Sequence, residues 1–197
     1  MSYYGVIFPE FWTGTTGRQL RVTGGKDAQL LGLYLATNRH ANMLGLYHLL
    51  PDDIRHETGM QLRAIARGFD VVAAESFAQF DAATSYVWVR QMARIRLGLK
   101  AGESLAPEDK RVVALNRIYH AIEANPFLGE FYDLNRGILR LRGRRESIGL
   151  VVGINGHHHM SGLPSPLEAP SKPGTEIRYR DQVQESGVQV RGKDPKR

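Results

Sequence analysis

The chain has 197 residues, enough for one modest domain with appendages or for two small domains. Hydrophobic residues make up 42% of it, and it contains no cysteine, which excludes disulfides and thiolate zinc sites. Its 26 basic and 20 acidic residues give a formal charge of +6, which favours an anionic partner such as nucleic acid. No secretory signal is recognisable and no run approaches the roughly 20 apolar residues that span a bilayer, so we expect a cytoplasmic protein without a membrane partner.

The N-terminal part of the chain predicts two helices separated by a short strand. The first helix is expected over 27–38, where Asp27 suits a helix N-terminus and apolar residues gather on one side. These apolar residues are Leu30, Leu31, Tyr34 and Leu35. A strand is expected at 45–49, and a brief helix over 51–58 begins with proline and two aspartates. Gly59 then supplies the permissive backbone that a tight turn needs.

A second amphipathic helix is predicted after this turn and runs to about Glu75. Its apolar residues follow one another at spacings of three, four and three, which places them on one face. They are Leu62, Ile65, Phe69 and Val72. The opposite face carries Arg63, Ala64, Arg67 and Val71. Two strands joined by a short turn are then expected at 76–81 and 85–90, where apolar and aromatic residues alternate.

This order of elements is that of a winged helix-turn-helix, so the expected fold class is mainly α with a small β-hairpin. In such a domain the second helix enters a major groove, while the first helix and the hairpin rest on phosphates. Residues 82–102 contain cations and no carboxylate, which suits contact with phosphates. The helix residues are expected to read bases and the arginines after the hairpin to hold phosphates. The predicted DNA contacts are Gln61, Arg63, Ala64, Arg67, Ser85, Arg90, Arg94 and Arg96.

The rest of the chain predicts a helical extension and a tail. Gly, Ser and Pro interrupt the pattern at 98–107, and a helix is expected from Pro107 to about Asn125, followed by a shorter one over 127–139. The first of these helices has an apolar stripe of Val112, Leu115, Tyr119 and Ile122. Prolines and glycines remove all apolar periodicity from 155 onward. The expected domains are 1–98, binding DNA; 107–145, a helical extension; and 155–197, a disordered basic tail.

Other segments admit a chemical interpretation beside a structural one. Asn38, His40 and Asn42 could belong to a nuclease site, but no recognisable carboxylate cluster or activated base accompanies them, and asparagines after a helix shape turns through backbone hydrogen bonds. The run His157–His159 could bind a transition metal, although successive side chains diverge in an extended chain. Gly24-Gly25-Lys26 lacks the spacing of a phosphate loop. We expect no catalysis, metal or cofactor.

The segment "RGILRLRGRR" at 136–145 is unusually basic. It is either a solvated helix end or a second, sequence-neutral phosphate clamp that raises affinity by counterion release. Its cations are Arg136, Arg140, Arg142, Arg144 and Arg145.

Several stretches resemble the winged-helix domain of phage replication initiators, also called replisome organisers. They are "FWTG" at 11–14, "DAQLLGLYLATNRHANMLGLYHLLPDDIRHETG" at 27–59, "FAQFD" at 77–81 and "YVWVRQM" at 86–92. The resemblance covers about Tyr4 to Leu97. A helical pair, "PEDKRVVALNRIYHAIEANPFLGEFYDL", extends it toward Leu141.

The resemblance implies sequence-specific binding of double-stranded DNA at a phage replication origin, and recruitment of the replication machinery in the host cytoplasm. The extension at 110–141 would contact a protein partner such as a replicative helicase or helicase loader, and a second copy of the chain is a further candidate partner. Two alternatives remain. One is a transcriptional regulator with the same domain, and the other is a winged helix that docks a protein and does not bind DNA.

Overall fold

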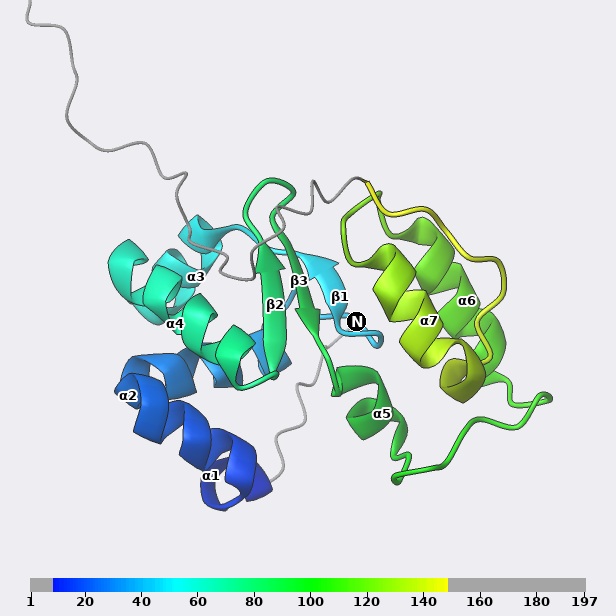
Figure 1. The fold of residues 1–197 in the computed structure, drawn as a ribbon, viewed down its shortest axis with the longest axis horizontal. Helices are drawn as coiled ribbons and strands as arrows, with labels where there is room; N and C mark the ends of the chain where they lie inside the picture. Colours follow the sequence, from blue (N-terminus) through cyan, green and yellow to red (C-terminus); the bar gives the residue numbers. More distant parts are fainter. Residues whose placement is uncertain (1–8, 149–197) are drawn as a thin grey trace, which may run out of the picture. The chain divides into compact units, whose positions relative to one another are not determined.

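The structure is a computed structural model that describes residues 9–148 of the chain. The predicted tail at 155–197 lies outside the described residues. Those residues form helices and a small antiparallel sheet (Figure 1). In chain order the elements are α1 (Glu10–Thr13), α2 (Thr15–Thr37), β1 (Leu46–His48), α3 (Pro51–Thr58), α4 (Leu62–Ala74), β2 (Ala78–Asp81), β3 (Tyr86–Val89), α5 (Met92–Leu97), α6 (Arg111–Ala121) and α7 (Leu128–Leu139). The predicted order of helices and strands from 27 to 90 is confirmed.

The sheet has the strand order β1-β3-β2, and both pairs of strands are antiparallel. Because side chains alternate along a strand, the central strand β3 sends residues to two different cores. Val87 and Val89 join the core formed with α2, α3 and α4, whereas Tyr86 and Trp88 join the core formed with α5, α6 and α7. The sheet therefore lies between two groups of helices, as Figure 1 shows.

The first core contains most of the residues that the sequence predicts for it, with two exceptions. Leu31, Leu35, Ile65 and Val72 are almost completely buried, but Leu30 is 39% exposed and Leu62 is 40% exposed. Leu30 is one residue from Leu31, about 100° around the helix, and so lies at the margin of the buried side. Leu62 is in the first turn of α4, where Met60 from the preceding turn is buried instead.

Helix α2 is longer than the helix that the sequence predicts. It begins at Thr15 rather than at Asp27, and Gly25, with φ of 71°, kinks it near the middle. The earlier half was not predicted because glycines at 17, 24 and 25 argue against a helix. Two of these glycines permit close packing, since a Cβ on Gly17 would meet the Phe11 carbonyl and a Cβ on Gly24 would meet Val71.

The second core joins the predicted helical extension to the sheet. The stripe of Val112, Leu115, Tyr119 and Ile122 is buried as predicted. Helix α6 begins at Arg111 and not at Pro107, and α5 was not predicted at all. All the described residues belong to one compact unit, so α6 and α7 pack as part of the folded body.

Candidate nucleic-acid interface

The turn between α3 and α4 is held by local backbone chemistry. Helix α3 ends at Gly59, whose φ of 73° is left-handed and whose N–H donates to the Arg55 carbonyl at 2.9 Å. The Thr58 hydroxyl donates to the Ile54 carbonyl and accepts the Met60 N–H at 3.2 Å. The two helices are thus joined by a short turn whose direction is fixed.

The inward face of α4 is fixed by three contacts of different kinds. Ile65 and Val72 are buried against α2, and Gly68 lies so close to Leu31 that a Cβ there would be 2.7 Å from a Leu31 methyl carbon. Phe69 stacks on Phe80 of β2 with ring centroids 4.2 Å apart. The rotation of α4 about its own axis is therefore determined, and with it the residues that face solvent.

The outward face of α4 presents Arg63 and Arg67 to solvent, one turn apart. Neither guanidinium takes part in an ion pair with a described residue. Gln61 is exposed at the start of the helix and makes no capping hydrogen bond with its side chain. Ala64 is only partly exposed because it packs against the core, so it lies at the margin of this face.

The β2–β3 turn, residues 82–85, has small side chains and contains no charged residue. Ala82 and Ala83 are exposed, and the Thr84 hydroxyl and N–H both donate to Asp81. Ser85 has a φ of 54°, and its carbonyl accepts the Leu49 N–H at 2.8 Å. Any contact of this turn with a phosphate would therefore go through hydroxyl or N–H groups.

Arg90, which the sequence predicts as a phosphate ligand, forms an ion pair within the protein. Its Nη2 lies 3.0 Å from Glu130 Oε1 on α7, and its guanidinium lies 4.7 Å from the centre of the Trp88 ring. A cation held by an acid and an aromatic face stabilises the packing of α7 on the sheet. The sequence could not show this pairing, because Glu130 is 40 residues away.

Arg96, which the sequence also predicts as a phosphate ligand, is hydrogen-bonded within the fold. Its Nη1 donates to the carbonyls of Ala41 and Asn42 at 3.2 and 2.8 Å, and its Nη2 donates to the Ala36 carbonyl at 3.0 Å. These carbonyls belong to the end of α2 and the loop after it, where helix carbonyls lack partners. Burial lowers the pKa of Arg96 from its ordinary value. Arg94 is likewise engaged, because its Nη2 donates to the Lys100 carbonyl.

Three arginines of the basic segment at 136–145, for which the sequence suggests either a solvated helix end or a phosphate clamp, are engaged within the protein. Arg144 pairs with Asp133 at 3.2 Å and thereby lowers the pKa of that carboxyl. Arg145 donates to the carbonyls of Tyr119 and Ile122 at the end of α6, and Arg140 donates to the Leu105 carbonyl at 2.9 Å. Most of the positive charge of this segment is therefore used within the protein.

The asparagines after α2 act as the sequence predicts. The Asn38 amide donates to the Tyr34 carbonyl at 2.9 Å and to the Tyr47 hydroxyl at 3.0 Å, and this hydroxyl donates to the Leu35 carbonyl at 2.6 Å. Asn42 accepts the N–H groups of Leu44 and Gly45 and donates to the Leu46 carbonyl at 2.7 Å. Burial raises the pKa of Tyr47. Both asparagines thus hold a turn together.

The surroundings of these asparagines include one histidine beside one carboxylate. His40 Nε2 lies 3.9 Å from Asp53 Oδ2, but residues 9–148 contain no group of three potential metal ligands. The histidines at 157–159 lie outside the described residues.

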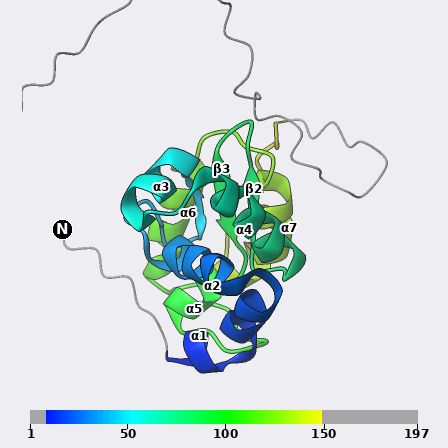
Figure 2. The same ribbon diagram turned by 90° about the vertical axis from the view of Figure 1, so that its left-hand side faces the viewer.

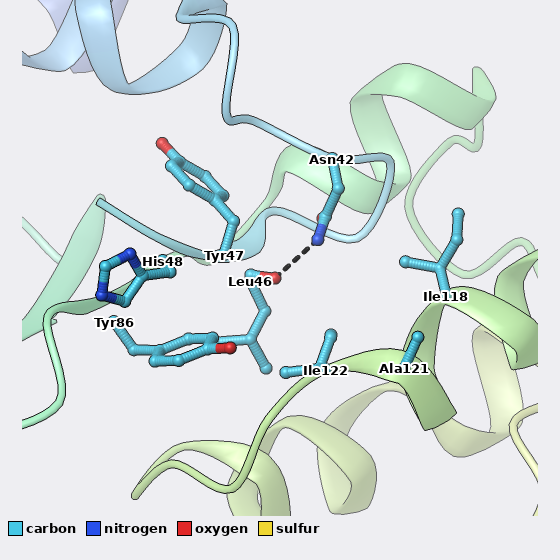
Figure 3. Close-up of a pocket in the computed structure, with 8 residues that line it drawn as sticks. All are labelled: Asn42, Leu46, Tyr47, His48, Tyr86, Ile118, Ala121 and Ile122. Carbon is cyan, nitrogen blue, oxygen red and sulfur yellow. Dashed lines mark hydrogen bonds between the residues drawn. The ribbon is translucent and has the colours of Figure 1, made fainter.

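A small cleft of about 290 Å³ lies beside the edge strand β1, next to the C-terminal end of α6 (Figure 3). Ile118, Ala121 and Ile122 line its far side. Two of its polar groups already have partners, since the Asn42 amide donates to the Leu46 carbonyl and the Tyr86 hydroxyl accepts the Glu123 N–H. The cleft contains no carboxylate or guanidinium, so it offers little to an anion.

A basic surface that was not predicted from the sequence lies on the N-terminal half of α2. Arg18, Arg21 and Lys26 are exposed there, and no ion pair of the described residues includes them. A signal was present, because residues 11–26 contain these cations and no carboxylate.

No family model matches the chain, and no curated protein or solved structure is significantly similar to it. The described residues define a mainly helical protein with a small three-stranded antiparallel sheet. None of their helices is both long enough and apolar enough to cross a membrane.

Proposed function

We propose that this chain is a winged helix-turn-helix protein that binds double-stranded DNA in a sequence-specific manner. Three features support the assignment: the order of helices and strands, the sheet order β1-β3-β2, and the tight turn between α3 and α4. In proteins of this class the second helix of the turn enters the major groove and the hairpin lies beside it. Helix α4 and the β2–β3 hairpin correspond to these two parts.

The observation that carries the proposal is the state of Arg63 and Arg67. Both guanidiniums are exposed and unpaired on the helix that would enter the groove, whereas Arg90 and Arg96 are engaged within the protein. A free arginine can grip guanine O6 and N7 with two hydrogen bonds, and Gln61 suits adenine in the same way. The β2–β3 turn would rest on phosphates through Ser85 and its neighbours.

The biological role proposed for this binding is initiation of phage DNA replication in the host cytoplasm. The resemblance of 11–14, 27–59 and 77–92 to phage replication initiators supports this role. Helices α6 and α7 would then contact the recruited partner, a replicative helicase or helicase loader. Transcriptional regulation by the same domain is distinguished by the site, because an initiator binds repeats clustered at an origin and a regulator binds an operator near a promoter.

The test is selection of bound duplexes from random DNA, followed by affinity measurements on the selected site. The variant Arg63→Ala/Arg67→Ala should lose most sequence preference, since each bidentate base contact contributes about 1–3 kcal/mol of discrimination. Arg117→Ala/Arg142→Ala is the matched control, because both of its arginines are exposed and lie on or beside α6, on the other side of the sheet.

Both variants remove the same charge, so a nonspecific effect of charge would weaken them equally. Loss confined to the α4 variant, on the selected site, supports base reading by this helix. Equal affinity of the α4 variant and the wild-type protein across a range of salt concentrations would contradict it. Failure of the wild-type protein to enrich any sequence would contradict sequence-specific binding altogether.

A further inference from the structure

The N-terminal half of α2 carries basic and hydroxyl side chains that the fold alone does not require. Residues 11–26 contain several threonines, Arg18, Arg21 and Lys26, but no carboxylate. The three cations and most of the threonines are exposed. Helix α3, by comparison, exposes both charges, since Asp52 and Arg55 form an ion pair there. A purely cationic, hydroxyl-rich face is suited to an anionic partner.

This half of α2 is held beside the C-terminal half of α4. Gly24 packs against Val71, and the Thr23 hydroxyl donates to Glu75 Oε1 at 2.7 Å. Further along, Leu31 packs on Gly68, so residue numbers rise along α2 while they fall along α4. The two helices are therefore antiparallel neighbours, and Figure 2 shows them on the same side of the sheet. A ligand lying along α4 would meet α2 next.

A groove of about 530 Å³ opens where the first half of α2 meets the end of α4. Six of its eight lining residues have polar side chains; the lining consists of Thr13, Gly14, Thr15, Arg18, Gln19, Val22, Thr23 and Glu75. Hydroxyl, amide and guanidinium groups are the donors that protein side chains offer to phosphate oxygens. Glu75 is the acidic residue among those that line the groove, and its Oε1 already accepts a hydrogen bond from the Thr23 hydroxyl.

We propose that this surface, centred on Arg18, Arg21 and the groove beside them, binds the phosphodiester backbone of DNA next to the segment read by α4. The proposal rests on the proposed function. Arg67 and Glu75 are about 12 Å apart along α4, and Thr23 and Arg18 are about 7 Å apart along α2. If the two segments were collinear, they would span at most about 20 Å, the length of about six base pairs at 3.4 Å each.

In this arrangement the two helices have different roles in binding DNA. Helix α4 discriminates between sequences, because its side chains face base edges in the groove. Helix α2 adds affinity for any sequence, because phosphates are the same at every position. The surface extends the length of DNA that the protein covers without changing the sequence it selects.

The test compares Arg18→Ala/Arg21→Ala with Arg117→Ala/Arg142→Ala, which removes the same charge from the other side of the sheet. Affinity is measured for the selected duplex and for a scrambled duplex over a range of salt concentrations. Each lost phosphate contact lowers the salt slope by about 0.9, so two lost contacts lower it by about 1.8 and weaken binding about 30-fold at 0.15 M salt. Both duplexes should weaken equally with the α2 variant.

A third variant, Glu75→Gln, should act in the opposite direction and bind both duplexes more tightly, because it removes a like charge that faces the phosphates. Circular dichroism and thermal unfolding establish that each variant is folded. A salt slope for Arg18→Ala/Arg21→Ala that equals that of the control pair would overturn the proposal.

The outcomes separate this proposal from the function on which it rests. If Arg63→Ala/Arg67→Ala loses discrimination while Arg18→Ala/Arg21→Ala matches the control, α4 reads DNA and the α2 surface does not take part. If the wild-type protein shows a salt slope near zero on both duplexes, both proposals fail. A loss of sequence preference in the α2 variant would also overturn the division between the helices.

Discussion

Replacing Arg96 tests whether this arginine belongs to the fold or to a DNA surface. Arg96→Met keeps most of the aliphatic stem and removes the donors to the carbonyls of Ala36, Ala41 and Asn42. A hydrogen bond to a charged group contributes about 1.5–3 kcal/mol, and because this guanidinium is partly exposed, water replaces part of the loss. We therefore expect the free energy of unfolding to fall by about 2–4 kcal/mol. For a folded body of this size the melting temperature should fall by about 5–15 °C.

The assay is thermal and urea unfolding together with DNA binding at a temperature where the variant is fully folded. Arg96→Met should bind the selected duplex within about twofold of the wild-type protein and with the same salt slope, since no phosphate contact is lost. Arg96→Lys should recover only part of the stability, because a lysine ammonium cannot reach all three carbonyls that the planar guanidinium of Arg96 binds. As the matched control, Arg63→Met should change stability by less than about 0.5 kcal/mol and should weaken binding. An Arg96→Met protein with wild-type stability and a reduced salt slope would show that this arginine contacts phosphate.

The remaining predictions concern one pair of glycines and one tyrosine. Gly45 and Gly59 both have a φ of 73°, but a Cβ on Gly45 would lie 2.8 Å from the Val89 carbonyl oxygen, whereas a Cβ on Gly59 meets nothing within 4 Å. In urea denaturation, Gly59→Ala should cost about 1–2 kcal/mol and Gly45→Ala clearly more, and equal costs would show that the loop at Gly45 adapts. Burial raises the pKa of Tyr47 above its value in the unfolded chain. The stability that the neutral Tyr47 hydroxyl contributes is therefore complete below about pH 10 and is lost as the pH rises through the folded pKa. Over this range the free energy of unfolding falls by up to about 1.4 kcal/mol per pH unit. Tyr47→Phe should lower stability at neutral pH but should show a shallower fall between about pH 10 and pH 12, and parallel curves for the two proteins would contradict this account.

The elements from 27 to 90 could be predicted because their signals are local. The stripe of α4 depends on helical periodicity, the end of α3 on a glycine, and the hairpin on alternation within a few residues. The first half of α2 could not be predicted in this way. Its glycines lower helix propensity, and the reason for two of them is close packing against Phe11 and Val71. That reason exists only in the folded chain.

Helix α5 was missed for a related reason. It has only six residues, from Met92 to Leu97, too few for periodicity to reveal. Its buried residues, Met92, Ala93 and Leu97, pack into cores shared with distant parts of the chain. Sequence analysis assigned its arginines to DNA because the surrounding segment lacks carboxylates. The fold uses both of them to satisfy backbone carbonyls instead.

The arginines of this protein show why basic composition is a weak guide to a binding surface. The carbonyl that Arg96 reaches on Ala36 is 60 residues away in sequence, and the carboxylate that holds Arg90 is 40 residues away. A guanidinium N–H that is bound to a carbonyl at a helix end cannot turn to a phosphate without uncovering that carbonyl. On the side of α4, the exposed cations that form no ion pair with a described residue are Arg63, Arg67, Arg18, Arg21 and Lys26. A binding surface is therefore better inferred from the unpaired cations than from the density of arginines, and the interface that we propose on α2 and α4 is drawn from exposed cations of this kind.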